Sequence, residues 1–171
     1  MKTSIKKIDC SYNLEDNRII DKLAGVLCFE EPEMIKKSKE FWNDWFSNKI
    51  EGDKITIVTE KTNKDNKQSL IGVVRFWKTP YCNNKWLIEG LEVIATERRK
   101  GIGRTMVKYG LDILRKSGIE KISVHIRNTN IPSIRLHKSL GFVKVSLGAI
   151  DSFGEFNENI DEYILLLKET W

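Results

Sequence analysis

The residues best suited to chemistry lie in a short glycine-containing turn near residue 100. Gly101 and Gly103 precede a segment with helical periodicity. Amides exposed at a helix start bind phosphate with help from the helix dipole, and glycine lets the backbone approach an anion closely. Four basic residues flank this turn: Arg98, Arg99, Lys100 and Arg104. Positive charge at a helix start is unfavourable unless an anion lies there. The turn therefore predicts a phosphate site rather than an ordinary solvated basic turn.

Two common nucleotide motifs do not fit this turn. A dinucleotide-binding fingerprint would need glycine at the position of Met106. A P-loop would need Gly-Lys-Ser/Thr where the chain has Gly103-Arg104-Thr105. The phosphate ligand must therefore be bound in another way.

Hydrophobic periodicity predicts the elements that position this turn. Alternating or apolar runs predict strands over residues 4–8, 54–59, 70–77, 86–94, 121–126, 142–147 and 162–167. Apolar stripes predict helices over 14–28 and 34–46, a helix opened by Gly101-Ile102-Gly103 and ended by Gly118, and a short helix over 133–139. Polar loops are expected over 61–68 and 151–161, and the first of them would close a hairpin. The order indicates a mixed α/β fold.

The segment Arg98–Gly103 resembles the Arg/Gln-x-x-Gly-x-Gly/Ala pyrophosphate loop of the GCN5-related N-acetyltransferase (GNAT) superfamily. Leu91-Glu92-Val93 precedes this loop at the family spacing. Five positions resemble the family's later Asn-x-x-Ala-x-x-Leu-Tyr-x-x-x-Gly-Phe block: Asn130, Ser133, Leu136, Gly141 and Phe142. The resemblance covers about residues 70–168, and the N-terminal third matches only in its order of elements.

The resemblance implies a central, twisted, mostly antiparallel sheet with splayed central strands and flanking helices. It implies one N-acetyltransferase domain over residues 1–171, with an acceptor-side region at 1–60 and an acetyl-coenzyme A core at 70–168. The Val93 amide would meet the thioester carbonyl, and Asn130 would bond the pantetheine arm or its adjacent backbone. The pyrophosphate would be held by the loop residues Arg98, Arg99, Lys100, Gly101, Ile102, Gly103 and Arg104.

Acetyl transfer also needs a base for the amine and an acid for the departing thiolate. By resemblance the acid is a tyrosine directly after Leu136, but this chain has His137 there, so an acid and a packing role both stay open. Glu89 matches the glutamate of small-polyamine acetyltransferases, and His125 matches a histidine or glutamate of amino-terminal acetyltransferases. We favour Glu89 as the base, because its charge would also attract an ammonium. Glu92 ranks third.

An aromatic run over residues 41–46 flanks Asp44, and such a wall could receive a cationic amine. A core-facing stripe already explains the helical spacing of these aromatic residues, so we favour a core role.

Composition limits the remaining classes of function. With 171 residues, of which 40% are hydrophobic, the chain suits one domain. A net charge of +5 suits a polyanion such as coenzyme A, and an aromatic-basic motif for nucleic acid is lacking. Cys10, Cys28 and Cys82 predict reduced thiols and no metal site, because neither a CxxC pair nor a nearby histidine accompanies them. A signal-type apolar stretch and a membrane-length run are lacking, so we expect a cytoplasmic protein without a membrane partner.

These features predict an enzyme that moves the acetyl group of acetyl-coenzyme A to the amine of a small molecule by direct attack. No cysteine lies in either motif block, so an acyl-cysteine is not expected. Two alternatives stay open: peptide or protein N-terminal acetylation, and a non-catalytic coenzyme-binding sensor. The acceptor and the oligomeric state, a homodimer included, are not fixed by the sequence.

Overall fold

The computed structural model describes residues 2–8, 18–26 and 32–167. Cys10, Cys28 and the two ends of the expected helix over 14–28 lie outside them. The chain forms two compact units, the first of which comprises Met1–Glu51, Ile55–Arg75 and Gly90–Met106. The second comprises Gly52–Lys54, Phe76–Glu89 and Val107–Trp171. The expected single domain over 1–171 stays a prediction.

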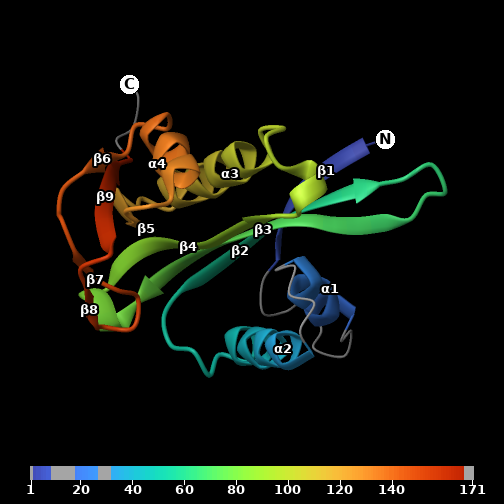
Figure 1. The fold of residues 1–171 in the computed structure, drawn as a ribbon, viewed down its shortest axis with the longest axis horizontal. Coiled ribbons are helices and arrows are strands. Elements are labelled where there is room, and N and C mark those ends of the chain that lie inside the picture. The colour runs from blue at the N-terminus through green and yellow to red at the C-terminus, as the bar shows by residue number, and fades with distance from the viewer. Residues whose placement is uncertain (1, 9–17, 27–31, 168–171) are drawn as a thin grey trace. The chain divides into compact units, whose positions relative to one another are not determined.

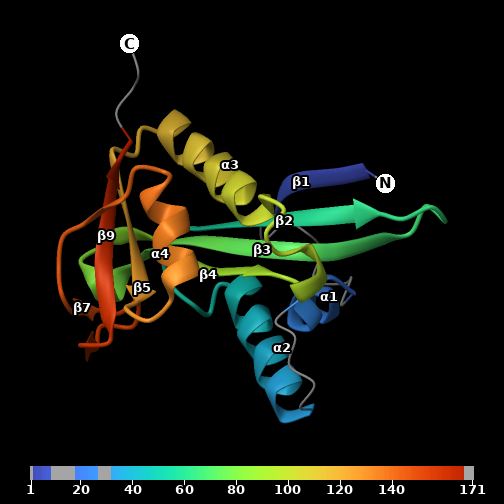
Figure 2. The ribbon, with the colours of Figure 1, turned by 45° about the horizontal axis from the view of Figure 1, so that its top comes forward.

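The first unit packs two helices against a set of strands. Its sheet order is β1 (Lys2–Ile8), β2 (Lys54–Thr62), β3 (Gln68–Thr79) and β4 (Lys85–Val93), and β3 and β4 continue into the second unit. Strands β1 and β2 are antiparallel, with Ile5 opposite Thr59. Helices α1 (Arg18–Val26) and α2 (Pro32–Phe46) lie together on one side of these strands (Figures 1 and 2). Their apolar stripes face inward, so Leu23, Trp42 and Trp45 are buried.

The strand order in the second unit is β4, β5 (Lys121–Arg127), β9 (Ile160–Leu166) and β6 (Val143–Lys144). Strands β4 and β5 run parallel and pair at Leu87–Ser123 and Ile88–Val124. Strand β9 is antiparallel to β5 along all seven residues of each. A separate two-stranded sheet joins β7 (Ala149–Ile150) to β8 (Phe156–Asn157). The mixed α/β fold and mostly antiparallel sheet are confirmed.

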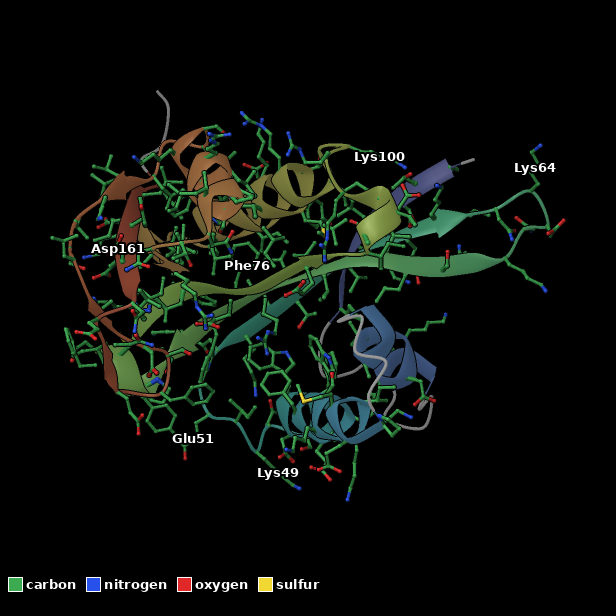
Figure 3. All side chains as sticks on the ribbon, in the orientation of Figure 1. Lys49, Glu51, Lys64, Phe76, Lys100 and Asp161 are labelled. Carbon is green, nitrogen blue, oxygen red and sulfur yellow. The ribbon has the colours of Figure 1, made fainter. Side chains whose placement is uncertain are left out.

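Helix α3 (Ile102–Lys116) begins in the glycine turn and ends before Gly118, as its sequence predicts. The expected apolar face is buried: Met106, Val107, Leu111 and Leu114. In the second unit, α3 and α4 (Ile131–Lys138) lie on the same side of the strands (Figures 1 and 2). Gly110 permits close contact with the buried ring of Phe76, because a Cβ at Gly110 would lie 2.1 Å from that ring (Figure 3).

Three sequence-based boundaries are wrong. The loop expected over 61–68 is a short turn, because β2 and β3 continue pairing while Asn63 Oδ1 accepts hydrogen bonds from the Asp65 and Lys67 amides. The strand expected over 142–147 is reduced to β6, which pairs with β9 at only two positions. The loop expected over 151–161 contains β8 and the start of β9, because local polarity does not reveal backbone pairing. Two short 3₁₀ helices, η1 (Pro80–Cys82) and η2 (Ala95–Glu97), were not predicted.

Candidate active site

The glycine turn of the first unit has the backbone conformation that an anion site requires. Arg99 and Gly101 have φ values of 65° and 81°, in the left-handed region, and α3 begins at Ile102. A Cβ at Gly101 would meet no other atom within 4 Å, so the turn faces open space. The first amides of any helix have no partner within the helix. The turn therefore presents helix-start amides where a phosphate can reach them.

Contacts within the first unit hold two basic residues of this turn, Arg98 and Lys100. Arg98 Nε donates a hydrogen bond of 2.8 Å to the carbonyl oxygen of Val93, which ties the turn to the end of β4. Lys100 Nζ lies 3.1 Å from Glu97 Oε2, and the same carboxylate pairs with Lys61 (Figure 3 labels Lys100). Glu97 therefore offsets part of the positive charge that the sequence places here. The side chains of Arg98, Arg99 and Lys100 remain solvent-exposed.

In the second unit, Ser133 links two of the predicted site residues. Asn130 is the N-cap of α4, and its Oδ1 accepts a hydrogen bond of 3.2 Å from the Ser133 amide. His137 Nδ1 lies 2.9 Å from the Ser133 carbonyl oxygen and its ring packs edge-on against Phe142. The capping role thus uses one lone pair of the Asn130 side-chain oxygen, and Nδ2 is the group that could donate a hydrogen bond to pantetheine.

His137 is held in its neutral form. The residue is 1% exposed, and burial lowers the pKa of His137 below the ordinary 6.5, although the bond to Ser133 opposes this shift. A carbonyl oxygen only accepts, so Nδ1 carries the proton and Nε2 is bare. Within the described part of the chain, Nε2 has no hydrogen-bond partner. These contacts favour the packing role of His137 over the role of a histidinium acid.

The burial of neutral His137 predicts a pH dependence of stability. Below about pH 6.5 the unfolded chain binds a proton at this residue before the folded chain does, so stability falls as the pH falls. The slope is at most about 1.4 kcal/mol per pH unit for one histidine. His137→Phe should reduce that slope in urea unfolding measured between pH 8 and pH 5. An unchanged slope would show that His137 is not buried as a neutral ring.

A second polar cluster surrounds His125 on β5. Glu162 stands directly opposite on β9, and its Oε1 lies 4.0 Å from His125 Nε2. The same oxygen accepts hydrogen bonds from Lys85 Nζ at 2.9 Å and Ser123 Oγ at 2.8 Å. The His125 side chain is 6% exposed, and neither ring nitrogen has a hydrogen-bond partner among the residues that the structure describes. This cluster brings a neutral base and a carboxylate together.

The ionisation of this cluster follows from burial and charge. Burial lowers the pKa of His125 below 6.5. The charge of Glu162 opposes this shift, the charge of Lys85 adds to it, and the charge of Asp151 opposes it. Burial would raise the pKa of Glu162, but the bonds from Lys85 and Ser123 hold it below the ordinary 4.5. At neutral pH the His125 imidazole is therefore uncharged and the Glu162 carboxylate is negatively charged.

Regular strand alternation would put Glu89 and Glu92 on opposite faces of β4, but Gly90 between them interrupts it. Gly90 has a φ of 55°, and its α-carbon lies against the Arg75 guanidinium, because a Cβ there would be 2.5 Å from a guanidinium nitrogen. Both carboxylates are half-buried. Burial raises the pKa of Glu92, which the charges of Arg98 and Arg75 oppose. Glu92 therefore borders two arginines of the first unit.

The aromatic run over 41–46 belongs to the core of the first unit. Trp42, Trp45 and Phe46 are buried, and the Arg75 guanidinium carbon lies 4.3 Å from the centre of the Phe41 ring. Asp44 pairs with Lys49 at 3.1 Å. The core interpretation is confirmed, and the cation against these rings comes from the chain itself.

Cys82, the described cysteine, is a buried thiol that donates to the Ile150 carbonyl oxygen at 3.5 Å. Burial raises the pKa of the Cys82 thiol, which opposes formation of a nucleophilic thiolate.

Comparison with known proteins gives the family of this chain. The model of the Acetyltransferase (GNAT) family matches residues 22–142, more than half of the chain. The chain belongs to this family. Streptothricin acetyltransferase from Streptomyces lavendulae is 33% identical to this GNAT chain over 60 residues, which is 35% of the chain and 32% of that protein. The two curated relatives are matched over about a third of their own length or less.

Solved structures share the GNAT fold over nearly the whole chain. YncA from Salmonella typhimurium, solved with its cofactor acetyl-CoA, is 20% identical, with a TM-score of 0.68 over 100% of this chain and 97% of that one. Spermidine N-acetyltransferase from Vibrio cholerae, solved with CoA and spermine, is 19% identical, with a TM-score of 0.62 over 96% and 95%. Among the helices of the described ranges, none has the length and hydropathy to span a membrane.

The sequence suggested His125 as a candidate site residue but did not indicate Glu162 and Lys85 as its neighbours. The alternation of β5 places Ser123 and His125 on one face, which was visible in the sequence. The sequence did not show that β5 pairs with β9, the pairing that brings Glu162 opposite His125.

Proposed function

We propose that this chain is an acetyltransferase that moves the acetyl group of acetyl-coenzyme A to the amine of a small molecule. The turn over residues 98–103 carries the proposal, because its two left-handed residues and open face suit a pyrophosphate at the start of α3. Val93, Arg98, Arg99 and Lys100 would support the coenzyme from the first unit, with Arg104 on the first turn of α3. Asn130 stays a separate candidate for binding the pantetheine arm. When bound, acetyl-coenzyme A supplies the thioester.

A glycine substitution tests the coenzyme site. In wild type, acetyl-coenzyme A at about 100 times its dissociation constant should stabilise the fold by about 2.7 kcal/mol. Gly101→Val should abolish the resulting shift in melting temperature, because a β-branched residue disfavours a φ of 81° and its side chain would occupy the open face. Thermal melts with and without acetyl-coenzyme A measure this shift.

Gly118→Val is the matched control. Gly118 ends the same helix, has a φ of 75° and likewise has no atom within 4 Å of an added Cβ. It should suffer a similar backbone strain and keep the ligand-induced shift. If Gly101→Val keeps the full shift as well, the turn is not the coenzyme site.

We assign the proton transfers to the second unit. His125 takes a proton from the amine, since it is neutral at pH 7 and its ring nitrogens are not hydrogen-bonded to the described residues. With a 6% exposed side chain, it would act through a water molecule. Glu89 attracts the ammonium form of the acceptor. These contacts support His125 as the base in place of Glu89, which the sequence favoured, and we propose that Glu89 keeps only the electrostatic role.

His137 covers the coenzyme side of α4 as a neutral ring in this proposal. An essential acid would make His137→Phe lower turnover by about 10²-fold. A packing role leaves turnover nearly unchanged in the same variant, so the rate at pH 7 separates the two roles.

Peptide N-terminal acetylation is the second candidate, favoured by the position of His125 on β5. Release of coenzyme A thiol from acetyl-coenzyme A should be measured against small amines, diamines and short peptides. Release with small amines supports the main proposal, and release with peptides alone supports the second. Coenzyme binding without release from any of them would support a coenzyme-binding sensor.

A further inference from the structure

Glu162 has a geometry that the proposed chemistry does not yet use. Its side chain is 12% exposed, and Lys85 and Ser123 both donate hydrogen bonds to the same carboxylate oxygen. That oxygen lies 4.0 Å from His125 Nε2, which is too far for a hydrogen bond to the neutral ring and close enough for an ion pair with a protonated one. Glu162 is therefore placed to respond to the charge of His125.

We propose that Glu162 is a positioning residue for the base: its anchored carboxylate is the countercharge for the imidazolium that forms when His125 accepts the amine proton. The inference rests on the proposed function. In this step, relayed by a water molecule, an N–H bond of the acceptor would break and an Nε2–H bond of His125 would form, while the amine nitrogen would use the freed electron pair to bond the acetyl carbon. The C–S bond of the thioester would then break, and coenzyme A would leave as its thiolate. The positive charge then lies beside Glu162 in a buried site, where charge pairs interact strongly.

Lys85 acts in the opposite direction. Its ammonium neutralises Glu162 while His125 is neutral, which keeps the carboxylate ionised without drawing a proton onto the ring. The charged groups that act on His125 are Glu162 on β9, Lys85 on β4 and Asp151 after β7. The Cys82 thiol lies near the same three groups and stays protonated. Lys85 and Glu162 thus set the basicity of His125 from opposite sides.

Removing the charge of Glu162 and removing the charge of Lys85 should shift the pKa of His125 in opposite directions. Glu162→Gln should lower the pKa of His125 by about one pH unit, and Lys85→Met should raise it by a similar amount. The chain has two histidines, so nitrogen NMR of histidine-labelled protein gives two titrating rings, assigned with His125→Gln. His137 is the internal reference and should not shift. Glu162→Asp keeps the charge and should lie between wild type and Glu162→Gln.

Asp161→Asn is the matched control. Asp161 is the adjacent residue on β9, is also buried, and pairs with Lys144 at 2.6 Å (Figure 3 labels Asp161). Adjacent strand residues point to opposite faces, so this variant removes a similar buried charge on the other side of the strand. The His125 pKa should stay as in wild type.

The rate profile separates this inference from the proposed function. The acidic limb of the turnover profile should follow the NMR shifts, downward in pH for Glu162→Gln and upward for Lys85→Met. If the two variants shift His125 in the same direction or not at all, the inference fails although wild type still acetylates amines. NMR shifts without a moved rate limb also overturn it, because the pair would then be structural. Failure of wild type to acetylate any amine is a failure of the proposed function itself.

Discussion

His125→Gln should lower the turnover of acetyl transfer by about 10²- to 10⁴-fold, the contribution of a positioned general base. Glutamine keeps a polar side chain of similar reach and cannot accept a proton at neutral pH. In wild type, turnover should fall as the pH drops below 6.5, because burial lowers the pKa of His125 and protonation then removes the base. Steady-state rates between pH 5 and pH 9 measure both effects. The variant should lose this acidic limb.

Glu89→Gln shows whether Glu89 or His125 is the base. It removes charge and preserves shape, so it should chiefly raise the KM of a cationic amine and leave the acidic limb in place. If instead Glu89→Gln abolishes turnover and His125→Gln has little effect, Glu89 is the base, and the expected acceptor moves towards small diamines. Melts with acetyl-coenzyme A show whether either variant still binds the coenzyme.

Local sequence signals predicted the parts of the site that depend on neighbouring residues. Gly101 and Gly103 before an apolar stripe identify a helix start, and Gly118 identifies its end, because both features depend on local backbone conformation. Helix α3 and the turn before it follow these signals closely. The family match over residues 22–142 includes the motif residues on which the resemblance rests, from Leu91 to Phe142.

The surroundings of each side chain could not be predicted in the same way. Glu162 faces His125 because β9 pairs with β5 in one register, and a register is fixed by packing of the whole sheet. Gly90 interrupts the alternation of β4, so the relation between Glu89 and Glu92 cannot be counted along the sequence. A glycine inside a strand pattern is a signal for such an irregularity, and it was present in the sequence.

The contacts of the aromatic run over residues 41–46 also could not be predicted from the sequence. Its spacing predicted a buried stripe, but the sequence did not identify Arg75 as the cation that lies against it. The Arg75 guanidinium carbon is 4.3, 5.4 and 5.2 Å from the ring centres of Phe41, Trp42 and Trp45. Cation–π contact with a residue of another element satisfies these rings inside the first unit. An amine acceptor is therefore not needed to explain them.

Trp45→Ala should accordingly lower the free energy of unfolding by about 3–5 kcal/mol, the usual cost of deleting a buried tryptophan. Trp45 is 2% exposed, and its indole Nε1 donates a hydrogen bond of 2.9 Å to Thr56 Oγ1. The variant removes this donor from the Thr56 hydroxyl. Urea unfolding measures the loss as a lower midpoint. Phe156→Ala is the control, because that ring is 71% exposed and its removal should change stability by no more than about 0.5 kcal/mol.

Trp45→Phe separates the core role of this residue from an acceptor wall. The smaller ring keeps an aromatic face for Arg75 and loses the hydrogen bond to Thr56, so it should destabilise the fold less than alanine does. Since the rings already contact Arg75, the KM for a cationic amine should be unchanged in this variant. A raised KM with an unchanged unfolding midpoint would assign Trp45 to the acceptor instead of the core.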